Sequence, residues 1–290
     1  MADGTERRGR IVRVTVATLE VSGLDVEFSV EKTSKPDPNT CELTIYNLSR
    51  DHRAQLEELR PKKGDKRGIP VKIEAGYETT GTSQIWLGDL RTVESITSGA
   101  DVTTHLTSGD GERAIQTSHS EKAFGPGTAL DVAIRAMVKE LGIGDGNVSS
   151  ALAAISATGR AALSAPLEFG IAFAGPTSRL LTDWLASAGL TWSVQDGAIQ
   201  ILNRGQALSG KAILLDSVSG QNTGLIGSPT VSNEGVLHAE MLMTPDVFPG
   251  RLVTLRSKHL EGNFVIERAV YFGDNFGGRF GIEIEAPRYG

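Results

Sequence analysis

The sequence predicts a mainly β protein with an α/β insert, in which two small antiparallel, tube-like β-barrel domains flank a helix-plus-hairpin module. Three observations predict this class. Apolar and polar residues alternate in short runs at both ends of the chain, and glycine, 34 of 290 residues, separates those runs. The two longest helical stripes lie in the middle of the chain. We expect three domains: residues 1–117, 118–205 and 206–290.

The first third predicts about six strands and one short helix. Alternation is clear over 12–16 and 26–30, with a Ser22-Gly23 turn between them. Further strand-like runs cover 41–48, 69–77, 83–96 and 101–109. We expect these strands to form the first barrel.

The segment KPDPNTCELTIYNLSRDHRAQLEEL, 35–59, passes from a proline-rich loop through a strand into a helix capped by Ser49. Alternation places Cys41, Leu43 and Ile45 on one face of the strand. A catalytic thiol needs an electropositive, partly exposed site, so the only cysteine is predicted to be a core residue. His52 is expected on the exposed side of the helix.

The middle of the chain predicts two helices. Thr128 and Asp131 resemble a capping box that starts the first helix, and Gly142 is placed to end it. Thr177 is expected to cap the second helix, which ends at Gly189. The alanine- and serine-rich stretch 147–166 carries no assignable pattern.

A β-hairpin is expected after the second helix, in TWSVQDGAIQIL, 191–202. Asp196-Gly197 is a typical two-residue hairpin turn. This turn sets Val194 opposite Ile199, with Trp192 and Ile201 on the same face.

The last third returns to strands and repeats the order of the first third. Strand-like runs cover 211–218, 235–243, 250–257, 262–274 and 278–286. The runs that begin near 71, 84 and 101 correspond to runs that begin near 251, 262 and 279. The echo predicts two similar antiparallel modules, the first of which contains the inserted helix.

Composition and motifs indicate no enzyme, cofactor or metal. The net charge of −6 argues against a general nucleic-acid binder, and one cysteine gives neither a disulfide nor a cysteine metal cluster. The five histidines show no metal-ligand spacing. The phosphate-loop-like run 205–211 fails, because Ala212 replaces the required Ser/Thr and a strand is expected after it.

One loop concentrates positive charge: Arg60, Lys62, Lys63, Lys66 and Arg67. A solvated surface loop is the default interpretation of such a run. The functional interpretation is an electrostatic contact with an acidic partner subunit.

The run PNTCELTIYNLS, 38–49, resembles the opening of the baseplate and tail hub proteins of tailed bacteriophages and phage-like injection machines. The C-terminal runs MTP, 243–245, FPGRLV, 248–253, GNFVI, 262–266, and GD, 273–274, are similar to the family's barrel. Together these segments cover about half of the chain. The structural and interface candidates are therefore Cys41, Leu43, Ile45, Tyr46, Asn47, Leu48, Lys62, Lys63, Lys66, Arg67, Pro245, Pro249 and Gly250.

The resemblance implies a homotrimer whose two barrels per chain form a pseudo-hexameric ring between a six-fold tail tube and a three-fold spike. Its partners would be the tail tube protein, the spike protein and other baseplate subunits, and double-stranded DNA would pass through without specific binding. We expect no membrane segment or signal peptide, folding in the host bacterial cytoplasm and residence in the virion. The alternatives are a peptidoglycan hydrolase of the tail tip, the equivalent hub of a tailocin or injection machine and, last, a carbohydrate-binding tail module.

Overall fold

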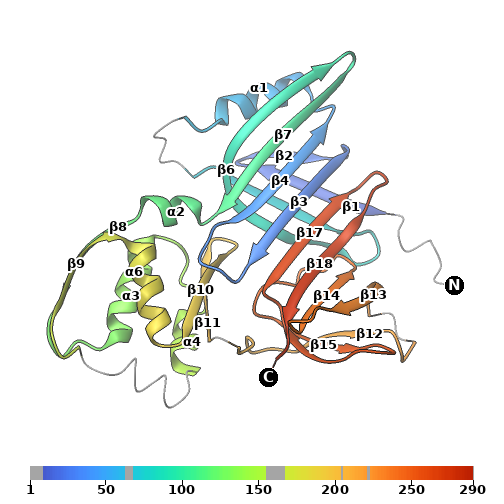
Figure 1. The fold of residues 1–290 in the computed structure, drawn as a ribbon. Coiled ribbons are helices and arrows are strands. Elements are labelled where there is room, and N and C mark those ends of the chain that lie inside the picture. The colour runs from blue at the N-terminus through green and yellow to red at the C-terminus, as the bar shows by residue number, and fades with distance from the viewer. Residues whose placement is uncertain (1–8, 63–67, 155–166, 204, 221–222, 290) are drawn as a thin grey trace. The chain divides into compact units, whose positions relative to one another are not determined.

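The computed structural model describes residues 9–62, 68–154, 167–203, 205–220 and 223–289 (Figure 1). The chain divides into two compact units. The first combines both ends of the chain, Met1–Thr33, Thr40–Gly109 and Ser209–Gly290. The second contains Ser34–Asn39 and Asp110–Leu208. The predicted class, mainly β with an α/β insert, is confirmed.

Strands dominate the first unit. Its N-terminal part contains β1 (Arg10–Val16), β2 (Leu19–Ser22), β3 (Val26–Thr33), β4 (Asn39–Tyr46), α1 (Arg50–Leu59), β5 (Pro70–Tyr77), β6 (Gly81–Ser98) and β7 (Asp101–Asp110). Its C-terminal part contains β12 (Ile213–Asp216), β13 (Leu225–Val231), β14 (Val236–Met241), β15 (Leu252–Arg256), β16 (Glu261–Val265), β17 (Arg268–Asp274) and β18 (Phe280–Pro287).

These strands do not form two closed barrels, so that part of the prediction is wrong. Eleven strands from both ends of the chain form one sheet, in the order β13-β14-β18-β17-β3-β4-β7-β6-β5-β1-β2. A separate three-stranded sheet has the order β12-β15-β16. The physical reason is that β17 pairs with β3 and joins two edges that closed barrels would have kept apart.

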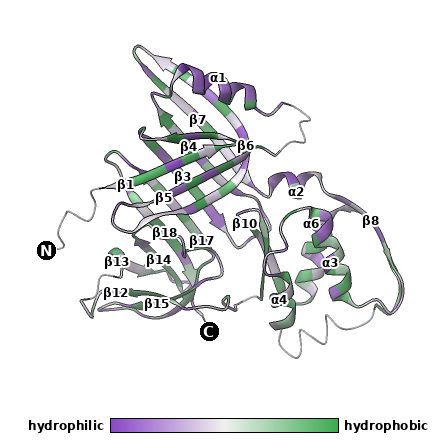
Figure 2. Cartoon of the chain, turned by 180° about the vertical axis from the view of Figure 1, so that it is seen from behind, coloured by the Kyte–Doolittle hydropathy of each residue, from purple (hydrophilic) through white to green (hydrophobic). Residues whose placement is uncertain are grey.

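Alternation along the strands sets the core of this unit. Val12, Val14 and Val16 of β1 are buried, as are Val71 and Ile73 of the adjacent β5. The resulting single cluster of buried residues also includes side chains of the three-stranded sheet. Figure 2 shows hydrophobic and hydrophilic residues alternating along these strands.

Helix α1 begins as predicted. Ser49 Oγ accepts the backbone N–H of His52 at 3.2 Å, which satisfies one of the free donors at the helix N-terminus. The helix is largely hydrophilic in Figure 2, and Leu56 is its one buried residue. His52 is partly exposed.

The second unit combines helices with two antiparallel strand pairs. Its elements are α2 (Glu112–Thr117), β8 (His119–Phe124), α3 (Leu130–Leu141), α4 (Val148–Ala154), β9 (Ile171–Pro176), α6 (Thr177–Ser187), β10 (Leu190–Gln195) and β11 (Ala198–Asn203). The pairs are β8 with β9 and β10 with β11. Part of the unassigned stretch 147–166 is thus helical, and 155–166 lie outside the described residues.

Both predicted helix caps of this unit are wrong. Helix α3 has Ala129, not Thr128, at its N-cap, and it has no side-chain cap because alanine carries no hydrogen-bond acceptor. Pro176 is the N-cap of α6, and the hydroxyl of Thr177 bonds to that of Ser120 at 2.8 Å instead. Gly142 ends α3 in the left-handed conformation, as predicted.

The hairpin prediction is confirmed in its register. Val194 pairs with Ile199 and Trp192 with Ile201, and all four side chains are buried. Asp196 and Gly197 both have positive φ, as a two-residue turn between twisted strands requires.

Candidate assembly surface

The order of strands that the first and last thirds of the sequence share is also a repeat in how the strands pair. We call β3–β7 the first copy and β13–β18 the second copy. In the first copy β3 pairs with β4, β6 with β7 and β5 with β6, each antiparallel. In the second copy β13 pairs with β14, β17 with β18 and β15 with β16, again antiparallel. The two copies therefore share one topology.

Backbone hydrogen bonds align the copies residue by residue. Leu90 N donates to Ile69 O at 2.8 Å in the first copy, and Ile266 N donates to Arg251 O at 3.0 Å in the second. Immediately after Leu90 the register of β6 shifts, and immediately after Ile266 the strand restarts as β17. Hence β6 corresponds to β16 and β17 together, with Leu90 equivalent to Ile266.

A second pair of hydrogen bonds aligns the other strands. Tyr46 N donates to Asp25 O at 2.9 Å, between β4 and the start of β3. Leu242 N donates to Gly224 O at 2.8 Å, at the same place between β14 and β13. Tyr46 is therefore equivalent to Leu242, and β3 to β13.

The copies join where β17 pairs with β3, from Arg268 opposite Thr33 to Asp274 opposite Glu27. We call this pairing the seam. Arg268 binds a carboxylate on each neighbouring strand, with Nε 2.6 Å from Glu31 and Nη1 2.8 Å from Glu285. The hydrogen bonds to both carboxylates raise the pKa of Arg268, with that to Glu31 the larger cause.

Close approach at the seam also requires a glycine. Gly273 lies opposite Phe28, and a side chain at this position would overlap the ring of Phe28. The next residue, Asp274, accepts the backbone N–H groups of the loop that follows, Phe276, Gly277 and Gly278. Partial burial acts to raise the pKa of Asp274, but these bonds outweigh it and lower the pKa.

One face of the sheet is acidic. Residues paired directly opposite each other share a face, and on the polar face of strands from both copies the carboxylates outnumber the basic side chains. In the strands from β14 to β7 and in the second half of β6, the carboxylates are Glu27, Glu31, Glu42, Glu94, Glu240, Asp274, Glu283 and Glu285, and the arginine and lysine side chains are Arg268 and Arg279. A polyanion on this face would meet mainly repulsion.

The apolar candidates of the first copy are core residues. Cys41, Leu43, Ile45 and Leu48 are each at most 2% exposed. Burial, with a smaller contribution from Glu42, raises the pKa of Cys41, so the thiol stays protonated. Their role is structural, as predicted from alternation.

Tyr46 and Asn47 lie at the end of β4, close to the start of β7. Asn47 has a positive φ of 54°, its N–H donates to Val102 O at 2.7 Å, and its side-chain oxygen accepts Val102 N at 3.1 Å. Tyr46 is 37% exposed, and its hydroxyl donates to Glu27 at 3.2 Å. Asn47 thus fixes the turn that leads to α1, while Tyr46 stays at the surface.

The second-copy candidates surround the turn before β15. Gly250 has φ of 91° and donates its N–H to Ile266 O at 2.7 Å. Pro249 and Gly250 are buried, whereas Pro245 is exposed. The FPG segment therefore makes the turn that starts β15.

Two residues of the basic loop, Arg60 and Lys62, lie within the described part of the chain. Lys62 is exposed, and Arg60 forms an ion pair with Glu57 at 3.0 Å. Lys63, Lys66 and Arg67 lie outside the described residues.

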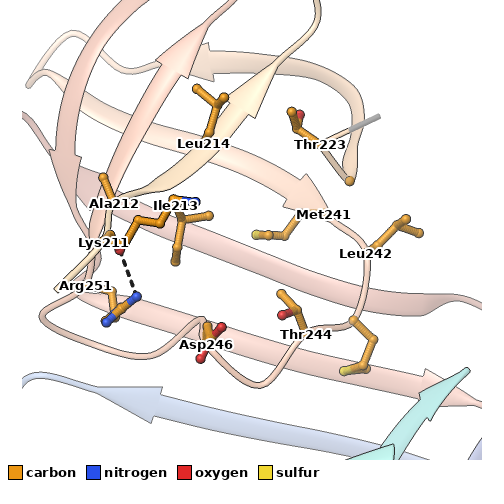
Figure 3. A pocket seen from close by; sticks show the side chains of 12 residues that line it. Lys211, Ala212, Ile213, Leu214, Thr223, Met241, Leu242, Thr244, Asp246 and Arg251 are labelled. Atoms are coloured by element: carbon orange, nitrogen blue, oxygen red, sulfur yellow. Dashed lines mark hydrogen bonds between the residues drawn. The ribbon is translucent and has the colours of Figure 1, made fainter. Parts of the chain in front are cut away.

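The second copy also contains a cleft of about 420 Å³ between β12, the end of β14 and the turn before β15 (Figure 3). Lys211 and Arg251 lie together at one end, where Arg251 Nη2 donates to Lys211 O at 2.9 Å. Met241 and Leu242 lie at the other end. Lys211 and Ala212 lead into strand β12, which confirms that no phosphate-binding helix follows them.

Within the ranges that the structure describes, no group of three or more His, Cys, Asp or Glu side chains is arranged to hold a metal ion. The described helices include none long and apolar enough to cross a membrane.

Sequence reasoning missed the seam and strand β13. Arg268 and Gly273 meet Glu31 and Phe28 across more than 230 residues of chain, and no local pattern encodes such a contact. Strand β13 was not predicted because it contains the Gly-Ser-Pro run 227–229, and glycine and proline are rare in strands. The repeated order of strands in the first and last thirds could have indicated β13, since the repeat requires a strand equivalent to β3 before β14.

Comparisons with known proteins agree on one class. A family model described as "Baseplate hub gp41" matches residues 11–282. No curated protein sequence matches the chain.

Solved structures of low sequence identity share the fold. The 43 kDa tail protein of prophage MuSo2 from Shewanella oneidensis is 10% identical, with a TM-score of 0.62 over 96% of this chain and 98% of that one. A tail protein from Neisseria meningitidis MC58 has the same identity and TM-score, over 96% of both chains. The c3393 protein of Escherichia coli, a component of the type VI secretion system, is 9% identical, with a TM-score of 0.56 over 96% of this chain and 77% of that one.

Proposed function

Because the chain belongs to the baseplate hub gp41 family, we propose that it is the structural hub of a phage tail baseplate and forms a trimeric ring. Each chain would contribute its two copies, so that three chains present six similar positions. The ring would join a six-fold tail tube to a three-fold spike. The repeated topology is the main support for this proposal. Three chains with two equivalent modules each would present six similar positions to a six-fold tube and three identical chains to a three-fold spike.

The acidic sheet face supports a role in the DNA conduit. A passage for double-stranded DNA works best when it does not hold the phosphates, and a face rich in carboxylates repels them. In the ring we expect this face to line the channel. DNA would then pass without specific binding.

The hub would act without catalysis, through contacts with the tail tube protein, the spike protein and other baseplate subunits. It would fold in the host bacterial cytoplasm and reside in the virion. A hub of a tailocin would use the same ring. A component of the type VI secretion system is also among the structures of similar fold, and in this second setting no genome would pass.

Mass photometry of the purified protein at low salt tests the proposal. We expect a species of three chains that appears as a ring in negative-stain images. A stable single chain that clears peptidoglycan would contradict the hub and favour the hydrolase.

A further inference from the structure

Two of the strand edges in the first unit, the second half of β6 and the outer side of β13, have no partner strand among the residues that the structure describes. The second half of β6, Thr92–Ser98, pairs with β7 on one side only, since β5 pairs with β6 over Gly81–Asp89. Strand β13 pairs with β14 on one side only and ends the eleven-stranded sheet. Such edges are templates for pairing with another chain.

The seam indicates which kind of strand would pair with the open edge of β6. The second half of β6 is equivalent to β17, and the outer edge of β17 is occupied by β3. The strand equivalent to β3 is β13. By this equivalence, the edge of β6 should receive a β13 strand.

That β13 strand must come from another chain. Within one chain six strands separate β13 from β6, in an open sheet. We propose that β13 of one subunit pairs antiparallel with the second half of β6 of its neighbour, which repeats the seam between subunits. This inference rests on the proposed trimer and names the surfaces that close it.

The seam also sets the register of the contact. Tyr271 lies opposite Val30 and Phe272 opposite Ser29. Leu90 and Ile266 are equivalent, so Tyr271 corresponds to Ser95 and Phe272 to Ile96. The alignment of β13 with β3 makes Val231 equivalent to Val30 and Thr230 to Ser29. Ser95 should therefore lie opposite Val231, and Ile96 opposite Thr230.

Two features of the edges fit this partner. Ile96 is 50% exposed, and pairing would remove part of this apolar side chain from water. The Gly-Ser-Pro bulge of β13, 227–229, lies where the register against β14 shifts and has no counterpart in β3. Pro229 lacks an N–H, which a strand tolerates at such a bulge.

The contact is head-to-tail, because each subunit offers two different strands, the second half of β6 to one neighbour and β13 to the other. Head-to-tail contacts build a closed ring when the rotation between subunits permits closure. Eight strands of each chain, from β13 to β6, would then run continuously around the channel.

Disulfide trapping tests the pairing. Directly opposite residues of an antiparallel pair have Cα atoms about 4.5–5.5 Å apart, within the range that a disulfide spans. The double variant Ser95→Cys/Val231→Cys, in a Cys41→Ala background, should give covalent dimers and trimers on mild oxidation. The neighbouring pair Ile96→Cys/Thr230→Cys provides a second variant if the first does not fold.

The control pairs β6 with the other edge strand, β2, in Ser95→Cys/Glu20→Cys, which should stay monomeric in a denaturing, non-reducing gel. Mass photometry of the reduced proteins reports trimer formation separately. If the control variant forms disulfide-linked trimers, the pairing is wrong. If the reduced protein is a trimer but neither test variant forms disulfide-linked species, the pairing is also wrong, and in both cases the proposed hub still stands. The absence of any trimer would overturn both.

Discussion

Arg268 Nε lies 2.6 Å from Glu31 Oε1, and this ion pair crosses the seam between the two copies of the strand module. The second nitrogen of the guanidinium lies 2.8 Å from Glu285. One cation therefore binds two carboxylates on a sheet face that is mainly acidic. This arrangement makes the seam sensitive to salt and to the loss of one side chain.

Replacing Arg268 with Ala should weaken the seam. The Arg268 side chain is 37% exposed, so solvent screening limits the loss to about 0.5–1 kcal/mol, partly from the repulsion left between Glu31 and Glu285. Thermal unfolding at low salt should show this loss, and 1 M salt should reduce it. Equal stability of variant and wild type at low salt would contradict the account.

Gly273→Ala should destabilise the same seam by steric overlap. The new methyl group meets the ring of Phe28, and overpacking of this kind costs about 1–3 kcal/mol. Gly277→Ala is the matched control, because nothing lies within 4 Å of a Cβ there. Urea unfolding should separate the two variants, and equal midpoints would argue against the close approach.

A charge at Ile45 should prevent folding. Ile45 is fully buried, and an unpaired carboxylate there carries a desolvation cost of several kcal/mol. Ile45→Asp should therefore yield insoluble or unfolded protein by circular dichroism. Thr44→Asp, one residue away on the polar face, should fold; failure of both variants would show that the strand tolerates no charge on either face.

Cys41→Ala should leave assembly intact. The thiol is buried with a raised pKa, so it should resist thiol reagents in the native protein and react after unfolding. We expect a stability loss of about 1 kcal/mol from the smaller side chain. If the Cys41→Ala protein folds and forms a trimer but no longer assembles with its baseplate partners, Cys41 would be a functional residue.

The loop after β17 should depend on pH through Asp274. The folded-state pKa of this carboxyl is lowered, so the carboxylate stabilises the native state above the unfolded pKa of about 3.9, and that stabilisation is lost as pH falls through the folded pKa. Asp274→Ala should be less stable than wild type at pH 7, and the difference should shrink below pH 4. A difference independent of pH would contradict this role.

The sequence predicted what depends on local pattern. Alternation located the strands and the burial of Cys41, Leu43 and Ile45, and Asp196-Gly197 predicted a hairpin with its register. The cap at Thr177 failed because its hydroxyl has a partner, Ser120, that only the tertiary structure supplies.

The candidate assembly surface depends on contacts that no local pattern contains. The echo indicated two modules, but not that β17 and β3 would join them into one sheet instead of two barrels. The free edge of β6 became recognisable only after the two copies were aligned through Leu90 and Ile266. The division into domains 1–117, 118–205 and 206–290 stays a prediction.

The central claim is that three chains, each with two equivalent modules, form one ring. Mass photometry of the purified protein at low salt measures this directly. The account predicts a dominant species of three times the 30.8 kDa chain. A population that remains at the mass of one chain at every concentration would contradict it.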